Sequence, residues 1–382
     1  MKVFLIRTEL SNLDKEYSLI KLREPIDFAY LAGNLRDYIK DKCELKLIDL
    51  AAAKLNLKRE LLDEKPSLVV FQGYFGQEST VNELSNMSKN ILPECITAIV
   101  GELYPSKDFP FIDLYFNLNP IEQFNETLLG IEVDRSLDEI KQKVYNINLQ
   151  DQVNINLPDR SIYSDIDKYY FLNNEAIIEV HTSYTDTIYD KGLIGIKNGR
   201  LYDTKEIHMQ INNIISRGVY FKDFDLFDDT LRLKSIINLL SEKGHNMIYF
   251  AVGNWDTIKE NEELIDKFAQ IGLKALIMPF EFPEDEEKWI IMGEAIGILN
   301  KYNVEIVMYI DNALSEEEEE TLIYWLKEKK QALVYLTNGA LIKNKNIYKK
   351  LPLSFIQWFR WFNKVGLKEA HRRRKYYKKY VI

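Results

Sequence analysis

Two groups of ionisable side chains lie at or just after expected buried strands, where they could hold a metal ion or move protons. One group belongs to the apolar run 176–181 and its continuation, and the other follows the run 219–224. Carboxylate oxygens suit Mg²⁺ and Mn²⁺, and paired carboxylates can act as acid and base when burial separates their pKa values. The candidate ligand-binding residues at these strand ends are His181, Asp186, Asp190, Asp225, Asp228 and Asp229.

Ordinary structural roles compete with this interpretation and are preferred for each residue taken alone. Asp228 and Asp229 directly precede a helical run that begins at Thr230, so helix capping accounts for them. His181 at the end of a strand fits a core histidine held by a hydrogen bond. We therefore predict no metal site and keep a divalent-metal enzyme as an alternative.

The composition is that of a soluble globular protein long enough for two or more domains. The chain has 382 residues, of which 46% are hydrophobic and 29% charged, and its net charge of -9 argues against a general nucleic-acid binder. Two isolated cysteines, Cys43 and Cys95, provide no disulfide framework, and the four scattered histidines disfavour a zinc site. Short apolar runs predict neither a signal peptide nor a membrane span, so we expect a cytoplasmic protein.

Residues 1–150 alternate between strand and helix patterns, which predicts a domain with a parallel α/β sheet. Ligands on such sheets bind beyond the carboxyl ends of the strands. The expected strands are 3–6, 44–48, 67–72, 96–100 and 113–116, and the expected helices are 28–39, 80–90 and 121–129.

A polar, Tyr-rich connection at 151–174 leads to a second strand–helix series at 175–340. Six strands with five helices between them predict a partial (β/α)6 barrel, and active sites of such barrels lie at the carboxyl strand ends. The segment 183–190 follows the first of these strands. The expected strands are 176–181, 219–224, 246–252, 275–278, 304–310 and 332–336, with helices at 204–216, 230–241, 259–270, 284–299 and 316–329.

The C-terminal segment, residues 341–382, is aromatic and basic. Interleaved aromatic and basic side chains could stack on bases and neutralise phosphates, or could dock an acidic partner. We rank a solvated segment first, protein docking second and nucleic acid third. The candidate partner-binding residues are Arg372, Arg373, Arg374 and Lys375.

Several short motifs occur in an order that resembles the cobalamin-dependent radical SAM enzymes. That family has a cobalamin-binding Rossmann-like domain followed by a partial (β/α)6 barrel, and the resemblance covers the chain to about Leu336. Residues 24–36 resemble its Pro-x-Gly-x-x-x-Leu-Ala-x-x-Leu helix. The other matching segments are 65–71, 99–105, 224–230 and 264–273.

The resemblance implies a position for an iron–sulfur cluster, and this chain departs from the family there. The family's CxxxCxxC motif would supply three thiolates, but the corresponding positions are Ser183, Thr187 and Asp190. Iron–sulfur clusters need soft sulfur ligands, which hydroxyl and carboxylate oxygens do not replace. Tyr189 occupies the place of the aromatic residue that contacts SAM in the family. We therefore expect a degenerate member without a [4Fe–4S] cluster.

The first domain departs from the family at a ligand-binding glycine pair. Gly101 is retained, but the next position is Glu102, whose side chain could obstruct a close-lying ligand or repel its phosphate. The histidine motif that supplies a cobalt ligand is absent. We accordingly expect no cofactor, with cobalamin or SAM as open alternatives.

Two function hypotheses remain. The first is a pseudoenzyme that acts as a binding or scaffold subunit in peptide or natural-product modification, with a protein or peptide partner such as an intact radical SAM enzyme. The alternative is an enzyme, either a cobalamin- and SAM-binding methyltransferase or a divalent-metal enzyme that uses the carboxylates at the barrel mouth. No membrane partner is expected.

Overall fold

The fold is described from a computed structural model of the chain. The structure describes residues 1–8, 21–39, 42–53, 55–73, 77–101, 109–116, 121–146, 157–171, 174–180, 183–184, 200–201, 206–207, 209–210, 216, 218–223, 225–242, 247–310, 314–328 and 333–337. These residues form two compact units. The first contains the described residues up to Lys168 other than residues 21–23, and the second contains residues 21–23 and most described residues from Tyr169 onward.

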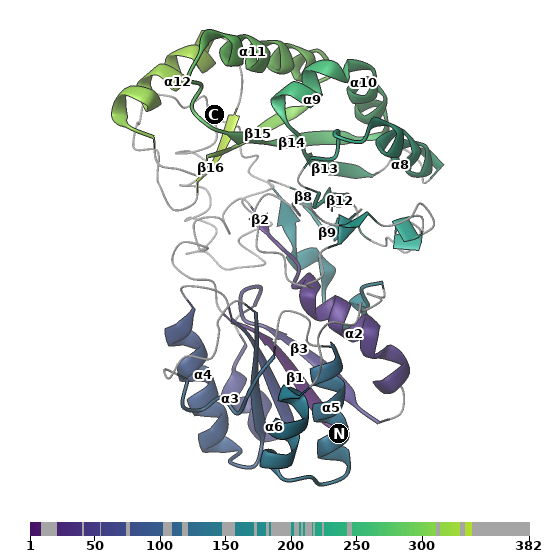
Figure 1. Cartoon of the computed structure of the whole chain (residues 1–382), viewed down its shortest axis with the longest axis vertical. Coiled ribbons are helices and arrows are strands. Elements are labelled where there is room, and N and C mark those ends of the chain that lie inside the picture. The colour runs from purple at the N-terminus through teal and green to yellow at the C-terminus, as the bar shows by residue number, and fades with distance from the viewer. Residues whose placement is uncertain are drawn as a thin grey trace. The chain divides into compact units, whose positions relative to one another are not determined.

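The first unit is a five-stranded parallel sheet in the order β3-β1-β4-β5-β6. Its helices lie on both sides of the sheet (Figure 1). The strands are β1 (Lys2–Arg7), β3 (Glu44–Asp49), β4 (Leu68–Gly73), β5 (Ile96–Gly101) and β6 (Leu114–Tyr115). The helices are α2 (Ile26–Ile39), α3 (Leu57–Glu64), α4 (Glu78–Ile91), α5 (Ile121–Glu132) and α6 (Leu137–Tyr145).

The central strands β1 and β4 are buried on both faces, because helices cover both faces of the sheet. Alternate residues of β1 point to opposite faces: Val3 and Leu5 pack with α2, α5 and α6, whereas Phe4 and Ile6 pack with α3 and α4. The unit is therefore a three-layer α/β/α sandwich with a core on each side of the sheet.

Residues 157–163 pack against α2 in the first unit. The Asp159 amide donates to the Ala29 carbonyl oxygen at 2.8 Å. Arg160 donates from Nε and from one terminal nitrogen to the two carboxylate oxygens of Glu24, each at 2.9 Å. The Glu24 side chain is fully buried, and burial of such a charge requires a pairing of this kind.

The second unit contains a six-stranded parallel sheet whose strands lie in chain order, β9-β12-β13-β14-β15-β16. The helices that connect these strands lie along one side of the sheet (Figure 1). Such sequential order with helices outside is that of an open (β/α) barrel. The strands are β9 (Ile177–Val180), β12 (Gly218–Phe221), β13 (Ile248–Val252), β14 (Leu273–Phe280), β15 (Glu305–Ile310) and β16 (Leu333–Thr337).

The helices of this unit are α8 (Thr230–Glu242), α9 (Trp255–Glu260), α10 (Glu262–Ile271), α11 (Glu286–Lys301) and α12 (Glu316–Glu328). One helix expected at 259–270 is instead a pair, α9 and α10, that meets at Asn261. Most of the helix expected at 204–216 lies outside the described residues. No helix among the described residues is both long and apolar enough to cross a membrane.

Short strands complete the described part. The antiparallel strands β2 (Lys21–Leu22), β7 (Tyr170–Phe171) and β8 (Asn174–Glu175) form a small sheet in the second unit. A two-stranded sheet joins β10 (Ser183–Tyr184) and β11 (Arg200–Leu201). The proposed domain boundaries at 150, 174 and 340 remain a prediction.

Candidate functional site

The first sheet has a topological switch point between β1 and β4. After β1 the chain passes through α2, which covers one face, and after β4 it passes through α4, which covers the other. Connections that leave two neighbouring strands toward opposite faces open a crevice at the carboxyl edge of a parallel sheet. Residues at the ends of β1 and β4 are therefore the first candidates for ligand contacts.

Thr8 directly follows β1 at this switch point. Its exposure is 0%, and its Oγ1 makes no hydrogen bond in the structure of the described residues. A buried hydroxyl without a partner costs about 1–3 kcal/mol. A hydrogen bond between this hydroxyl and a polar group of a bound ligand would offset that cost.

Two glycines lie side by side at the carboxyl edge. Gly73 ends β4, Gly101 ends β5, and the two pair in the register of the sheet. Without side chains at these two positions, a bulky ligand can approach the backbone closely. Gly101 was expected from the sequence as a ligand-binding position, whereas its neighbour Glu102 lies outside the described residues.

Buried polar pairs hold the strand ends around this crevice. Arg7 donates to both carboxylate oxygens of Asp49, at 2.8 and 2.6 Å, and thereby joins the ends of β1 and β3. Gln72 on β4 donates from Nε2 to Asp27 Oδ2 at 2.8 Å, in the first turn of α2. Bidentate and buried contacts of this kind fix side-chain orientation, so the edge is preorganised.

Both cysteines lie in the first unit and are poor thiolate donors. Burial raises the pKa of the Cys43 thiol to about 11 and that of the Cys95 thiol to about 12. The thiolate is the form that binds metals. The raised pKa values therefore make both cysteines poor ligands for iron. The described residues also contain no group of three or more His, Cys, Asp or Glu side chains arranged to hold a metal ion.

The second sheet carries buried charges at and beyond the ends of its first two strands. Glu179 on β9 accepts from Arg23 at 2.7 and 2.9 Å. Lys222 and Asp223, directly after β12, are 0% and 6% exposed. These charges gather at the carboxyl ends of the strands, where ligands bind on a sheet of this kind, so this end of the sheet is the second candidate site.

Asp225 is the acid–base candidate at this second site. Burial raises its carboxyl pKa from 3.8 to about 6, although hydrogen bonds from the Phe227 amide and Thr257 Oγ1 lower it. Both hydrogen bonds are 2.9 Å long. A carboxyl group that titrates near neutrality can give and accept a proton under working conditions.

The structure places the other expected residues differently. Asp228 and Asp229 are exposed, and Asp229 Oδ1 accepts from the Arg232 amide at 3.0 Å, a cap of α8. Ser183 follows the opening strand β9 along the chain, in β10, where it pairs with β11 rather than with the six-stranded sheet. Outside the described residues lie His181, Asp186, Thr187, Tyr189, Asp190, Arg372, Arg373, Arg374 and Lys375.

The sequence pattern missed Thr8, Gly73 and Lys222. Each follows or ends an apolar run, and in a parallel sheet that position alone indicates the ligand-binding edge. The pairing of Gly73 with Gly101 additionally requires the register between two strands, which no local pattern contains.

Comparison with known proteins identifies the fold. No family model matches the sequence, and no curated protein matches it. Among solved structures, the radical S-adenosylmethionine methyltransferase TsrM from Kitasatospora setae, with cobalamin and a [4Fe–4S] cluster bound, has a TM-score of 0.56 at 10% identity. That match covers 88% of this chain and 74% of TsrM.

A second solved structure is OxsB, a cobalamin-dependent S-adenosylmethionine radical enzyme, here with aqua-cobalamin and S-adenosylmethionine bound. Its TM-score is 0.54 at 13% identity, and the match covers 100% of this chain but 56% of OxsB. The chain thus spans little more than half the length of OxsB.

These findings correct the cofactor expectation. We expected no cofactor, yet the similar structures bind cobalamin, a [4Fe–4S] cluster and S-adenosylmethionine or its analogue aza-SAM. The expectation was wrong because it rested on single departures, Ser183 and Glu102 among them, whereas solved structures of the same fold hold these cofactors. The chain has the α/β fold of the cobalamin-dependent radical SAM enzymes.

Proposed function

We propose that the protein is a methyltransferase-like enzyme that binds a cobalamin-type cofactor at the carboxyl edge of the first sheet and SAM at that of the second. The observation that carries the proposal is the buried Thr8 hydroxyl beside the switch point, in the same edge as the Gly73–Gly101 pair. In support, TsrM is a methyltransferase and OxsB binds both cofactors.

The residues of the first edge have distinct roles in this proposal. Bound cobalamin would supply a carrier for the methyl group. Thr8 offers its hydroxyl to a polar group of the ligand, and the two glycines leave the backbone open to it. The Arg7–Asp49 pair keeps the ends of β1 and β3 in place, so that binding does not have to order them.

The residues of the second edge supply charge and a proton site. Asp225, with a carboxyl pKa of about 6, holds a proton below that pH and accepts one above it. Thr257 donates to Asp225 Oδ2 and fixes the direction of the carboxyl group. Asp225 is therefore the residue that we expect to accept a proton from a substrate during alkylation.

The test is a titration of the purified protein with hydroxocobalamin, followed by its absorbance change and by equilibrium dialysis. Thr8→Val removes the hydroxyl but keeps the shape. We expect affinity to fall by about tenfold, the equivalent of one hydrogen bond. Thermal stability should stay equal or rise, since an unsatisfied hydroxyl is removed.

The matched control is Thr127→Val in α5, where the lost hydroxyl donates to the Gln123 carbonyl oxygen within the helix. This variant should lose some stability and keep its cobalamin affinity. Absence of cobalamin binding by the wild-type protein, or equal affinities of the two valine variants, would refute the first-edge assignment.

A second candidate is a non-catalytic role as a binding subunit of a partner enzyme, possible in the same fold. The placement of both cysteines in the first unit, with raised thiol pKa values, favours it. Methyl transfer from labelled SAM by the protein alone would reject this candidate. Co-elution with a radical SAM enzyme encoded beside it, together with no turnover of its own, would support it.

A further inference from the structure

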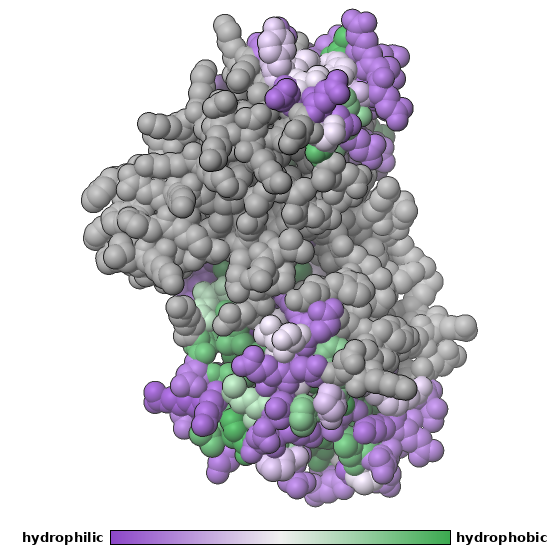
Figure 2. All heavy atoms as spheres, turned by 90° about the vertical axis from the view of Figure 1, so that its left-hand side faces the viewer, coloured by the Kyte–Doolittle hydropathy of each residue, from purple (hydrophilic) through white to green (hydrophobic). Residues whose placement is uncertain are grey.

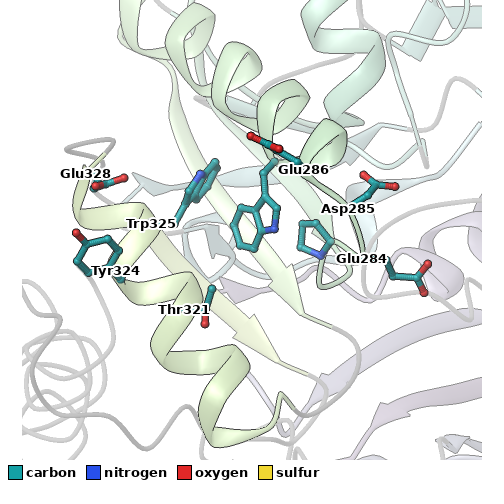
Figure 3. A pocket seen from close by; sticks show the side chains of 9 residues that line it. Glu284, Asp285, Glu286, Thr321, Tyr324, Trp325 and Glu328 are labelled. Atoms are coloured by element: carbon teal, nitrogen blue, oxygen red, sulfur yellow. The ribbon is translucent and has the colours of Figure 1, made fainter.

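A pocket outside both strand-end sites lies between α12 and the segment that enters α11. Its volume is about 480 Å³. Figure 3 shows Thr321 and Trp325 on the side of α12 toward the segment that carries Glu284, Asp285 and Glu286. Tyr324 and Glu328 lie at the outer side of α12, and the carboxylates of Glu284 and Asp285 point outward from the other edge of the pocket. The pocket belongs wholly to the second unit, and neither proposed cofactor site uses its residues.

Two tryptophans form the aromatic wall of this pocket. The rings of Trp289 and Trp325 lie 4.8 Å apart between centroids in an edge-to-face arrangement. The ring centroids of Phe282 and Trp289 are 5.5 Å apart, and those of Phe280 and Phe282 are 6.5 Å apart. The four rings thus form a continuous row from Phe280, at the end of β14, to Trp325 on α12, and these contacts hold the two indoles in place. The negative face of an indole attracts cations.

The rim of the pocket is strongly acidic. Residues 281–288 contain five acidic side chains and one basic side chain, and residues 314–328 contain six acidic and one basic. Glu284, Glu286 and Glu328 line the pocket, are exposed and make no ion pair with other described residues. Figure 2, which views the side where α12 lies, shows mainly hydrophilic residues with a few less polar ones between them on the described surface of this unit.

We propose that this aromatic and acidic pocket binds a basic side chain, Lys or Arg, presented by a partner polypeptide. The combination selects that occupant by charge and by ring chemistry. A purely apolar group would leave the carboxylates unused, and an anion would be repelled by them. A cation between the indole faces and the rim gains both cation–π and ionic contacts.

Other roles for the acidic side chains do not account for the pocket. Asp285 caps α11, because its Oδ1 accepts from the Lys288 amide at 2.9 Å. Glu318 caps α12 through Ser315, with contacts at 2.7 and 2.8 Å. Capping thus explains these two residues. Glu286 lies in the first turn of α11, where the helix dipole favours a carboxylate, but neither role explains Glu284 or Glu328. In the proposal, Glu284, Glu286 and Glu328 are the carboxylates that attract the positive charge of the ligand.

The experiment measures binding of a fluorescein-labelled peptide, Gly-Arg-Gly-Lys-Gly, to the full-length protein by fluorescence anisotropy at low and physiological salt. The charge variant is Glu284→Gln/Glu286→Gln/Glu328→Gln. The matched control, Glu94→Gln/Glu122→Gln/Glu242→Gln, removes three exposed carboxylates elsewhere. All variants keep Arg372–Lys375, so that any competition from these side chains stays equal. We expect the charge variant to bind at least about fivefold more weakly than the control.

A second series tests the aromatic contribution. Trp325→Phe keeps a ring, whereas Trp325→Leu keeps only apolar volume. Affinity should fall from wild type to Phe and again to Leu, because cation–π attraction is strongest for indole. Equal affinity for a peptide with norleucine in place of Arg and Lys would overturn the proposal, as would equal binding by the two glutamine triples. Failure of the Trp325 variants to fold leaves the glutamine comparison decisive, since those side chains are exposed.

Discussion

A single methyl group added at Gly33 tests the packing of residues 157–163 against α2. Gly33 lies within α2, where alanine normally stabilises a helix by about 1 kcal/mol relative to glycine. A Cβ atom at Gly33 would, however, overlap the Leu157 carbonyl oxygen and lie 3.2 Å from the Asp159 amide nitrogen. The backbone of residues 157–159 must therefore move away from the helix in Gly33→Ala.

The expected cost follows from the contacts that this movement disturbs. Overpacking against a backbone costs about 1–3 kcal/mol, and the hydrogen bond from the Asp159 amide to Ala29 contributes about 1 kcal/mol. Against the helix-propensity gain, we expect a net loss of about 1–3 kcal/mol in the free energy of unfolding. Urea denaturation followed by circular dichroism measures it.

The matched control is Gly297→Ala in α11, because a Cβ atom there meets nothing within 4 Å. That variant should gain up to about 1 kcal/mol from helix propensity alone. Hydrogen exchange of the Asp159 amide should become faster in Gly33→Ala and remain unchanged in Gly297→Ala. Equal stabilisation by both substitutions would show that residues 157–159 do not contact α2 as described.

Two further predictions concern buried polar groups of the second unit. The folded-state pKa of Asp225 is raised from 3.8 to about 6, so its contribution is fully present below about pH 4 and is lost as pH rises through 6. The free energy of unfolding of Asp225→Asn, relative to that of wild type, should therefore increase between about pH 4 and pH 7, by at most about 3 kcal/mol. Urea titrations that give the same difference between variant and wild type at both pH values would contradict this. The Tyr249 hydroxyl is buried, has no hydrogen bond among the described residues, and burial raises its pKa to about 12. Tyr249→Phe should match or exceed wild-type stability by up to about 1 kcal/mol, and a loss above that size in calorimetry would reveal a partner for the hydroxyl.

The strands were predictable because a strand that is buried on both faces has a continuous apolar sequence. The run 67–72 became β4 and the run 304–310 became β15, each within a residue or so at either end. Helix α3 was missed, because its eight residues bury only Leu57 and Leu61, and apart from the exposed Leu62 the others are charged. The helix expected at 259–270 is divided at Asn261, because α9 packs with α11 whereas α10 packs with α8. These are tertiary contacts, which the local sequence pattern does not contain.

The candidate site was less predictable than the fold. Asp225 and Gly101 were visible as polar or small residues at strand ends. The orphaned Thr8 hydroxyl and the Gly73–Gly101 pairing depend on burial and on strand register, which are tertiary properties. The family motifs pointed to the correct fold, whereas the departures at single ligand positions led to a cofactor expectation that the similar structures contradict.

The pairing of Glu24 with Arg160 bears on where the chain can be divided. A fragment that ended at residue 150 would leave a carboxylate with 0% exposure facing no guanidinium, and would uncover the side of α2 against which Leu157 and Asp159 lie. A fragment that ended at Lys168 would retain both. For anyone who wishes to isolate the N-terminal half, the tract after residue 156 is part of the folding unit rather than a tether to be trimmed.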